Sequence, residues 1–133
     1  MKYLLDTNVC IEYLRKRNPL LTARMSGVPQ QDKYLCPIVL GELYFGAYRS
    51  ARPLDGLAQV EAFARRFVIL PFDERAAQKY GELRADLSSR GQIIGPYDLQ
   101  IAAIALIQGV TLVTHNTREF SRVTGLSLDD WAI

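Results

Sequence analysis

Three carboxylates in this sequence stand in apolar surroundings, where an ionised side chain is unexpected. Asp6 follows the apolar residues 3–5, Glu42 interrupts residues 38–47, and Asp98 opens a stretch without charge that runs to residue 117. Each has an ordinary alternative, because Asp6 and Asp98 could cap helices and Glu42 could pair with a distant Lys or Arg. An unpaired buried charge costs several kcal/mol. The three acids together therefore predict a shared cationic partner.

A hard metal ion is the partner that this donor set suits. Carboxylate oxygens without a histidine or cysteine cluster favour Mg²⁺ or Mn²⁺. An ion held by Asp6, Glu42 and Asp98 would polarise a phosphate oxygen and lower the pKa of a water molecule, so that a phosphodiester is hydrolysed without a nucleophilic side chain. His115 is the only histidine, and a lone histidine in a turn is expected to be incidental rather than a general base.

Alternating strand and helix patterns must position these acids. At helical spacing, Glu42 shares the apolar stripe of its segment, and Asp98 begins a helix that is apolar on every side and so belongs in the interior. Such alternation predicts an α/β fold with a parallel sheet in an α/β/α sandwich. Strands are expected at residues 2–5, 34–36, 68–70 and 110–114, helices within residues 9–14, 38–47, 57–67, 76–87 and 98–107, a short amphipathic segment after Asn18-Pro19, and a final edge element within residues 125–133.

The polar residues after the first and last strong strands should meet. Asp6 directly follows one strand, and the polar run of residues 115–120 follows the other. The carboxyl ends of parallel strands form the edge where ligands bind. We therefore expect Asp6 and Asn116 at one edge, with Glu42 and Asp98 on helices nearby.

Bulk properties narrow the class of protein. The 133 residues suit one domain, and the net charge of +2 favours no particular partner. Cys10 and Cys36 lack metal-site spacing and are expected to be reduced core residues of a cytoplasmic protein. Neither a signal peptide nor a membrane span is expected, because Asp6 leaves no room for an early apolar segment and Gly109 divides the later one.

Four motifs stand out along the chain: Leu5-Asp6-Thr7-Asn8, Gly41-Glu42-Leu43, Gly95-Pro96-Tyr97-Asp98 and Val113-Thr114-His115-Asn116-Thr117-Arg118-Glu119-Phe120. Together they resemble PIN-domain ribonucleases, and most closely the VapC toxins of bacterial toxin–antitoxin systems. The resemblance covers nearly the whole chain, with the motifs in the family's order. It implies a single PIN domain over residues 1–133 that cleaves single-stranded or loop regions of RNA, with tRNA as one candidate. It also implies that the reaction uses Mg²⁺, for which Mn²⁺ can substitute. It also implies a homodimer and inhibition by a VapB-type antitoxin.

The resemblance assigns roles to individual residues. The metal-binding catalytic acids are Asp6, Glu42 and Asp98, the further catalytic candidates are Asn116 and Glu119, and the candidate substrate contacts are Thr7, Asn8, Thr114 and Arg118.

One position departs from the family pattern, because many PIN domains carry a fourth acid near the place of Asn116. Asn116 could act through water while Glu119 supplies the charge, which is the interpretation we favour, or the site keeps three carboxylates only. Glu119 could instead be a solvent-facing partner of Arg118 or Arg122.

Other interpretations stay open at the level of sequence. Tyr97 could stack on an RNA base or pack in the fold. A receiver-type signalling domain would also place acids at strand ends, but it needs a late lysine, and the last lysine here is Lys79. A non-catalytic PIN module that only binds protein would be expected to have lost one of the core acids, and all three are present.

Overall fold

A five-stranded parallel sheet forms the centre of the protein, and the computed structural model describes residues 1–133. The strands lie in the order β3-β2-β1-β4-β5. Their bounds are β1 Tyr3–Leu5, β2 Lys33–Leu35, β3 Val68–Ile69, β4 Thr111–Val113 and β5 Leu128–Asp129. The predicted parallel α/β architecture is confirmed, and the strands that precede Asp6 and Asn116 are direct neighbours.

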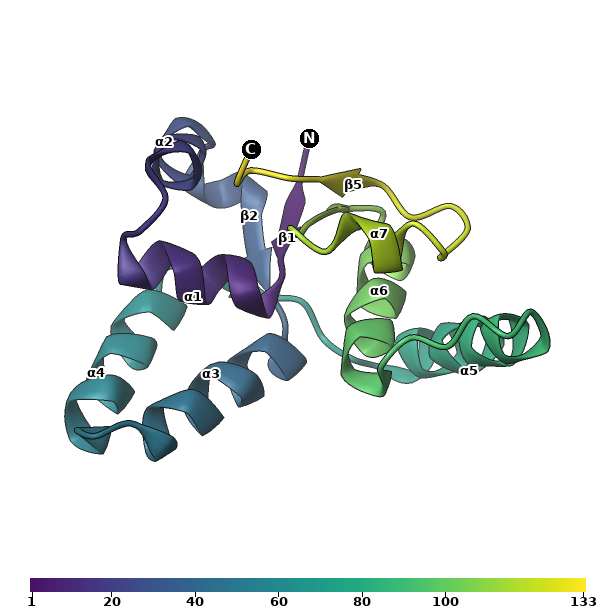
Figure 1. Cartoon of the computed structure of the whole chain (residues 1–133), viewed down its shortest axis with the longest axis horizontal. Helices are drawn as coiled ribbons and strands as arrows, with labels where there is room; N and C mark the ends of the chain where they lie inside the picture. The colour runs from purple at the N-terminus through teal and green to yellow at the C-terminus, as the bar shows by residue number, and fades with distance from the viewer.

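Helices connect the strands and cover the sheet (Figure 1). They are α1 Thr7–Arg15, α2 Pro19–Gly27, α3 Pro37–Arg49, α4 Pro53–Ala64, α5 Glu74–Ser89, α6 Pro96–Gln108 and α7 Thr117–Phe120, with a 3₁₀ turn at Gln30–Asp32. The short amphipathic segment after Asn18 is the full helix α2, because the Asn18 side chain accepts hydrogen bonds from the first-turn amides and Pro19 fits the first helical position.

Helix α6 runs through the core. Its residues Leu99 and Ile101–Ala105 are all buried, as its uniformly apolar sequence predicts. Gly109 ends the helix with a φ of 65°, a left-handed conformation that glycine adopts without strain. The chain can then turn directly into β4, which places the amino end of α6, with Asp98, beside the carboxyl edge of the sheet.

The last residues complete the sheet at its edge. Strand β5 pairs in parallel with β4, which confirms the expected edge element. Trp131 is fully buried and packs edge-on against Tyr3, with ring centroids 5.0 Å apart. The indole N–H donates to Asp129, so that the polar atom of this large side chain is satisfied.

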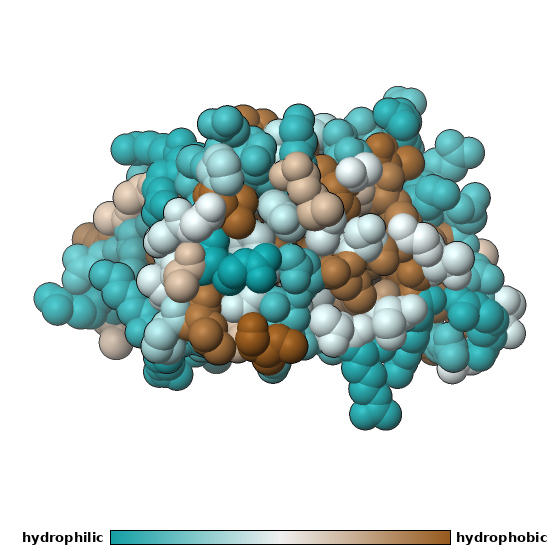
Figure 2. Space-filling model, turned by 90° about the horizontal axis from the view of Figure 1, so that it is seen from above, coloured by the Kyte–Doolittle hydropathy of each residue, from teal (hydrophilic) through white to brown (hydrophobic).

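Cys10 and Cys36 are buried free thiols, as expected of reduced core residues. None of the helices combines the length and the apolar character that a membrane crossing requires. The face seen in Figure 2 is mostly hydrophilic, with separate hydrophobic patches between the polar side chains.

Candidate active site at the carboxyl edge of the sheet

Asp6 lies at the centre of the edge, directly after β1. The residue is only 5% exposed. Oδ1 accepts a hydrogen bond of 2.8 Å from the Thr7 amide, and Oδ2 accepts one of 2.8 Å from the Thr114 hydroxyl. Burial raises the pKa of Asp6, the two hydrogen bonds oppose that rise, and the charge of Glu42 adds to it. Asp6 is thus both the cap of α1, as the ordinary alternative required, and a fixed carboxylate that its surroundings do not neutralise.

Thr114 connects the ends of β1 and β4. Its hydroxyl donates to Asp6 and accepts a hydrogen bond of 3.0 Å from the Asn116 amide. The residue is fully buried, so in this structure Thr114 holds Asp6 and offers no surface to a substrate. Its position instead fixes the orientation of the Asp6 carboxylate and brings the loop of Asn116 to the site.

Glu42 reaches the site from α3. The Thr7 hydroxyl donates a 2.6 Å hydrogen bond to Oε1 of Glu42. Thr7 is 7% exposed, and its hydroxyl holds an acid in this structure. The prediction that Thr7 contacts the substrate stays a prediction. The alternative partner for Glu42, a Lys or Arg, is wrong, because the salt bridges of the structure join other residues.

Asp98 faces the other acids from the first turn of α6. Its side chain is half-buried and does not cap the helix, whose N-cap residue is Gly95. Burial raises the pKa of Asp98 to about 6, and the charges of Asp6, Glu119 and Glu42 contribute to the rise. Asp98 therefore lies in the first turn of the helix, as the ordinary alternative required, but accepts no capping hydrogen bond, and three other acids act on its carboxylate.

Asn116 and Glu119 act as a pair at the start of α7. The Asn116 side-chain amide donates a 3.1 Å hydrogen bond to Oε2 of Glu119. The salt bridges of the structure include neither Glu119 nor Arg118 and Arg122. The charge of Glu119 raises the pKa of Asp98. Glu119 thus faces the acids rather than a basic neighbour, and this geometry supports the favoured interpretation of the fourth position.

The chemistry of this donor set fits a divalent cation. Burial and mutual repulsion act on carboxylates that no Lys or Arg compensates, and hard divalent ions prefer such oxygen ligands. As the side chains stand, no group of three acids is drawn together closely enough to coordinate one ion.

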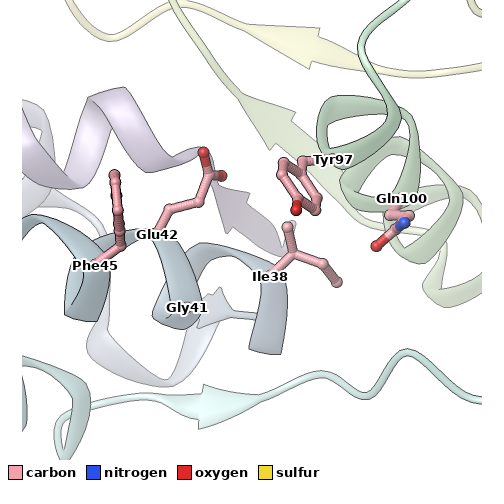
Figure 3. A pocket seen from close by; sticks show the side chains of 6 residues that line it. All are labelled: Ile38, Gly41, Glu42, Phe45, Tyr97 and Gln100. Atoms are coloured by element: carbon pink, nitrogen blue, oxygen red, sulfur yellow. The ribbon is translucent and has the colours of Figure 1, made fainter.

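The acids are reached from two hollows in the surface. One, of about 520 Å³, lies between α3 and α6 and includes Glu42 and Tyr97 (Figure 3). The other, of about 580 Å³, includes Asp6, Asn8 and Asn116. Asn8 and Arg118 are exposed, as a substrate contact requires.

The sequence anticipates the surroundings of three ring-bearing side chains near the site unequally. Nδ1 of His115 lies 2.9 Å from Oδ2 of Asp130, a pairing that the sequence does not indicate. Tyr97 is 62% exposed and so is not packed in the fold. Phe45, 61% exposed in the same hollow, was missed, because its helical spacing on α3 also fits a core residue.

Known proteins share this architecture. The family model of the PIN domain matches residues 3–126 of the chain. The tRNA(fMet)-specific endonuclease VapC of Shigella flexneri is 39% identical over 132 residues, 99% of each chain. Ribonuclease VapC2 of Haemophilus influenzae is 40% identical over 133 residues, 98% of each chain. The crystal structure of DNA-bound VapBC from Salmonella typhimurium superposes with a TM-score of 0.92 at 37% identity, covering 98% of both chains. The chain belongs to the PIN-domain family, and its full-length relatives are VapC proteins.

Proposed function

We propose that this chain is the toxin of a VapBC-type module, a metal-dependent endoribonuclease in which residues 1–133 act as one PIN domain. The observation that supports this most directly is the group of Asp6, Glu42, Asp98 and Glu119. Burial and the neighbouring acids raise the pKa of Asp6 and of Asp98 at the carboxyl edge of the sheet. The salt bridges of the structure include none of the four acids. The relatives named as VapC endonucleases and ribonucleases match over their full length.

The residues of the chain divide the work of the reaction. Asp6, Glu42 and Asp98 would hold the metal ion, which is Mg²⁺ or Mn²⁺. When bound, that ion supplies Lewis-acid activation of the phosphodiester and lowers the pKa of a water molecule. Thr7 and Thr114 keep Glu42 and Asp6 in fixed orientations by hydrogen bonds. The Asn116 side chain donates its N–H to Glu119, which leaves its carbonyl oxygen available to orient a water molecule or a ribose hydroxyl.

Substrate and partners follow from the same relatives. The Shigella flexneri protein is named for tRNA(fMet), and we propose RNA, with tRNA as a candidate, as the substrate here. Asn8 and Arg118 are the exposed residues placed to contact it. The Salmonella typhimurium structure is a VapBC complex, and we propose inhibition by a VapB-type antitoxin, a homodimeric toxin and a cytoplasmic location.

Cleavage of a small-RNA pool by purified protein, free of antitoxin, tests the proposal. We expect discrete fragments with Mg²⁺, none with EDTA, and none from Asp6→Ala. Glu82→Ala is the matched control, because Glu82 is an exposed acid on α5 that pairs with Lys79, and it should cleave like the wild type. Absence of cleavage by folded wild-type protein with Mg²⁺ would contradict the nuclease assignment and favour a module that only binds protein.

A further inference from the structure

The hollow beside Glu42 has an unusual lining for a site that handles phosphates. It is formed by Ile38, Gly41, Glu42 and Phe45 of α3 together with Tyr97 and Gln100 of α6. Phe45 and Tyr97 are 61% and 62% exposed. Figure 3 shows their rings on either side of the Glu42 carboxylate, with Ile38 below. Two large aromatic faces are therefore left to solvent at the position where the substrate must approach.

These faces suit a flat, partly apolar ligand with polar edges. Nucleobases that are not paired stack on aromatic side chains and are read at their edges by hydrogen-bonding groups. Gln100 lies in the same lining, and its side-chain amide can both donate and accept a hydrogen bond. Bases within a duplex do not offer their faces in this way, so the lining selects an unpaired nucleotide.

A cation without a salt-bridge partner lies against Phe45, one of the two rings of the hollow. The Arg49 guanidinium lies 5.3 Å from the centroid of the Phe45 ring. Arg49 takes part in no salt bridge, in contrast to Arg52 next along the chain, which pairs with Asp55 at 3.1 Å. A guanidinium that stacks on an aromatic ring and keeps its donors free is well placed to bind a phosphate. The charge beside Phe45 therefore complements a nucleic-acid backbone.

We propose that the hollow binds one unpaired nucleobase of the RNA, next to the phosphate that is cleaved. Phe45 and Tyr97 provide the stacking faces, Gln100 contacts the edge of the base, and Arg49 contacts a neighbouring phosphate. This inference rests on the proposed function, because it assigns a nucleotide subsite to the same nuclease.

Paired aromatic substitutions test the subsite through steady-state cleavage of a single-stranded RNA oligonucleotide taken from the cleaved region. We expect Tyr97→Ala and Phe45→Ala each to raise KM about tenfold, with a smaller change in kcat, because stacking holds substrate and transition state alike. Tyr97→Phe retains the ring and should restore binding. Tyr48→Ala is the matched control, because Tyr48 is an exposed aromatic on α3 outside the hollow.

An abasic nucleotide identifies the base as the group that is recognised. We expect one position beside the cleaved bond at which removal of the base raises KM for the wild type about tenfold but has little further effect on Tyr97→Ala. A 2-aminopurine at that position should lose fluorescence when it binds to the wild-type protein in EDTA. That quenching should be absent from Tyr97→Ala.

Filling the hollow provides a second test that does not remove a ring. An added Cβ at Gly41 or at Gly81 meets no atom within 4 Å, so Gly41→Leu should fold and place its side chain in the hollow. We expect Gly41→Leu to raise KM, whereas Gly81→Leu, on α5, should not.

The outcomes separate this inference from the proposed function. If the wild type cleaves RNA and the aromatic and Gly41 variants keep its KM, the nucleobase subsite is wrong. If the same variants change the oligomeric state or the affinity for an antitoxin while KM is unchanged, the hollow is a protein interface instead. If the wild type cleaves no RNA, it is the nuclease assignment that fails.

Discussion

Two threonine hydroxyls hold two of the acids without neutralising them. Thr7 donates to Glu42 and Thr114 donates to Asp6. An arginine in either place would fix the carboxylate equally well, but its charge would compete with a cation for the same oxygens. A neutral donor orients the ligand and leaves its negative charge available to the metal. A neutral hydroxyl therefore suits the metal site that we propose at these two positions.

Replacing the Thr114 hydroxyl by a methyl group tests this role. Thr114→Val leaves Oδ2 of Asp6 and the Asn116 amide without their partner, and we expect kcat/KM for RNA cleavage to fall about 10- to 100-fold. The free energy of unfolding should fall by about 1–3 kcal/mol. Thr114→Ser restores the hydroxyl and should recover most of the activity. Wild-type activity in Thr114→Val would show that Asp6 needs no such orientation.

The fourth acidic position can be tested by two substitutions at the start of α7. Because Asn116 donates to Glu119 and Glu119 raises the pKa of Asp98, we expect Glu119→Gln and Asn116→Ala each to lower cleavage by roughly tenfold or more. The apparent affinity for Mg²⁺ should fall more in Glu119→Gln, which removes a charge. If Glu119→Gln cleaves like the wild type while Asn116→Ala is inactive, Asn116 alone fills the position.

At the scale of the elements, α3 and α4 pack so closely that one glycine is required. A Cβ on Gly56 would lie 3.3 Å from the backbone Cα of Ala47 on α3. That contact is closer than ordinary van der Waals packing, and a backbone atom cannot move aside alone. Gly56 thus lets α4 return along α3, which supports the helix that carries Glu42.

Alanine substitutions should distinguish this glycine from one that has free space. Gly81→Ala on α5 should raise the free energy of unfolding by about 0.5–1 kcal/mol, because alanine favours the helix and nothing lies within 4 Å of its Cβ. Gly56→Ala should lose that gain and unfold more easily than the wild type. Urea unfolding followed by circular dichroism measures both. Equal stabilisation by the two changes would mean that α3 and α4 separate at little cost.

The sequence predicts the elements and the acids better than their contacts. Asp6, Glu42 and Asp98 are conspicuous because charge is rare within apolar segments, and local periodicity identifies the strands and most helices. The bonds from the two threonines depend on elements that meet only in the folded chain, so the sequence suggests substrate contacts in their place. Tyr97 shows the same limit, because a pattern of spacing does not tell an exposed ring from a packed one.

At the scale of the whole molecule, the uncompensated acids oppose folding. The pKa of Asp98 rises from 3.8 to about 6, and that of Asp6 rises as well. The folded protein therefore binds more protons than the unfolded chain between about pH 4 and pH 6, and stability falls as the pH increases through that range. Above about pH 6, the repulsion between Asp98 and the neighbouring acids remains until a cation binds.

Thermal unfolding with and without metal should show this balance. At pH 8 in EDTA we expect Asp98→Asn to be more stable than the wild type by about 1 kcal/mol, a value reduced for the half-exposed side chain. At pH 4 the difference should vanish. Added Mg²⁺ should stabilise the wild type at pH 8 and have less effect on Asp98→Asn or at pH 4. Glu61→Gln, an exposed acid paired with Arg65, is the control, and an identical response in Asp98→Asn would contradict the repulsion.

The bond between Asp6 and Thr114 joins residues 108 positions apart in the chain. A ribosome adds about 5–20 residues each second, so Asp6 has been synthesised for several seconds before its partner exists. Because β1 pairs with β4, the edge of the sheet that carries Asp6 and Asn116 also forms only after β4 has been synthesised. Nascent chains and products of premature termination that stop before Thr114 therefore lack the hydrogen bond that orients Asp6. For a protein that would damage the RNA of the cell that makes it, late assembly confines activity to molecules whose synthesis is nearly finished.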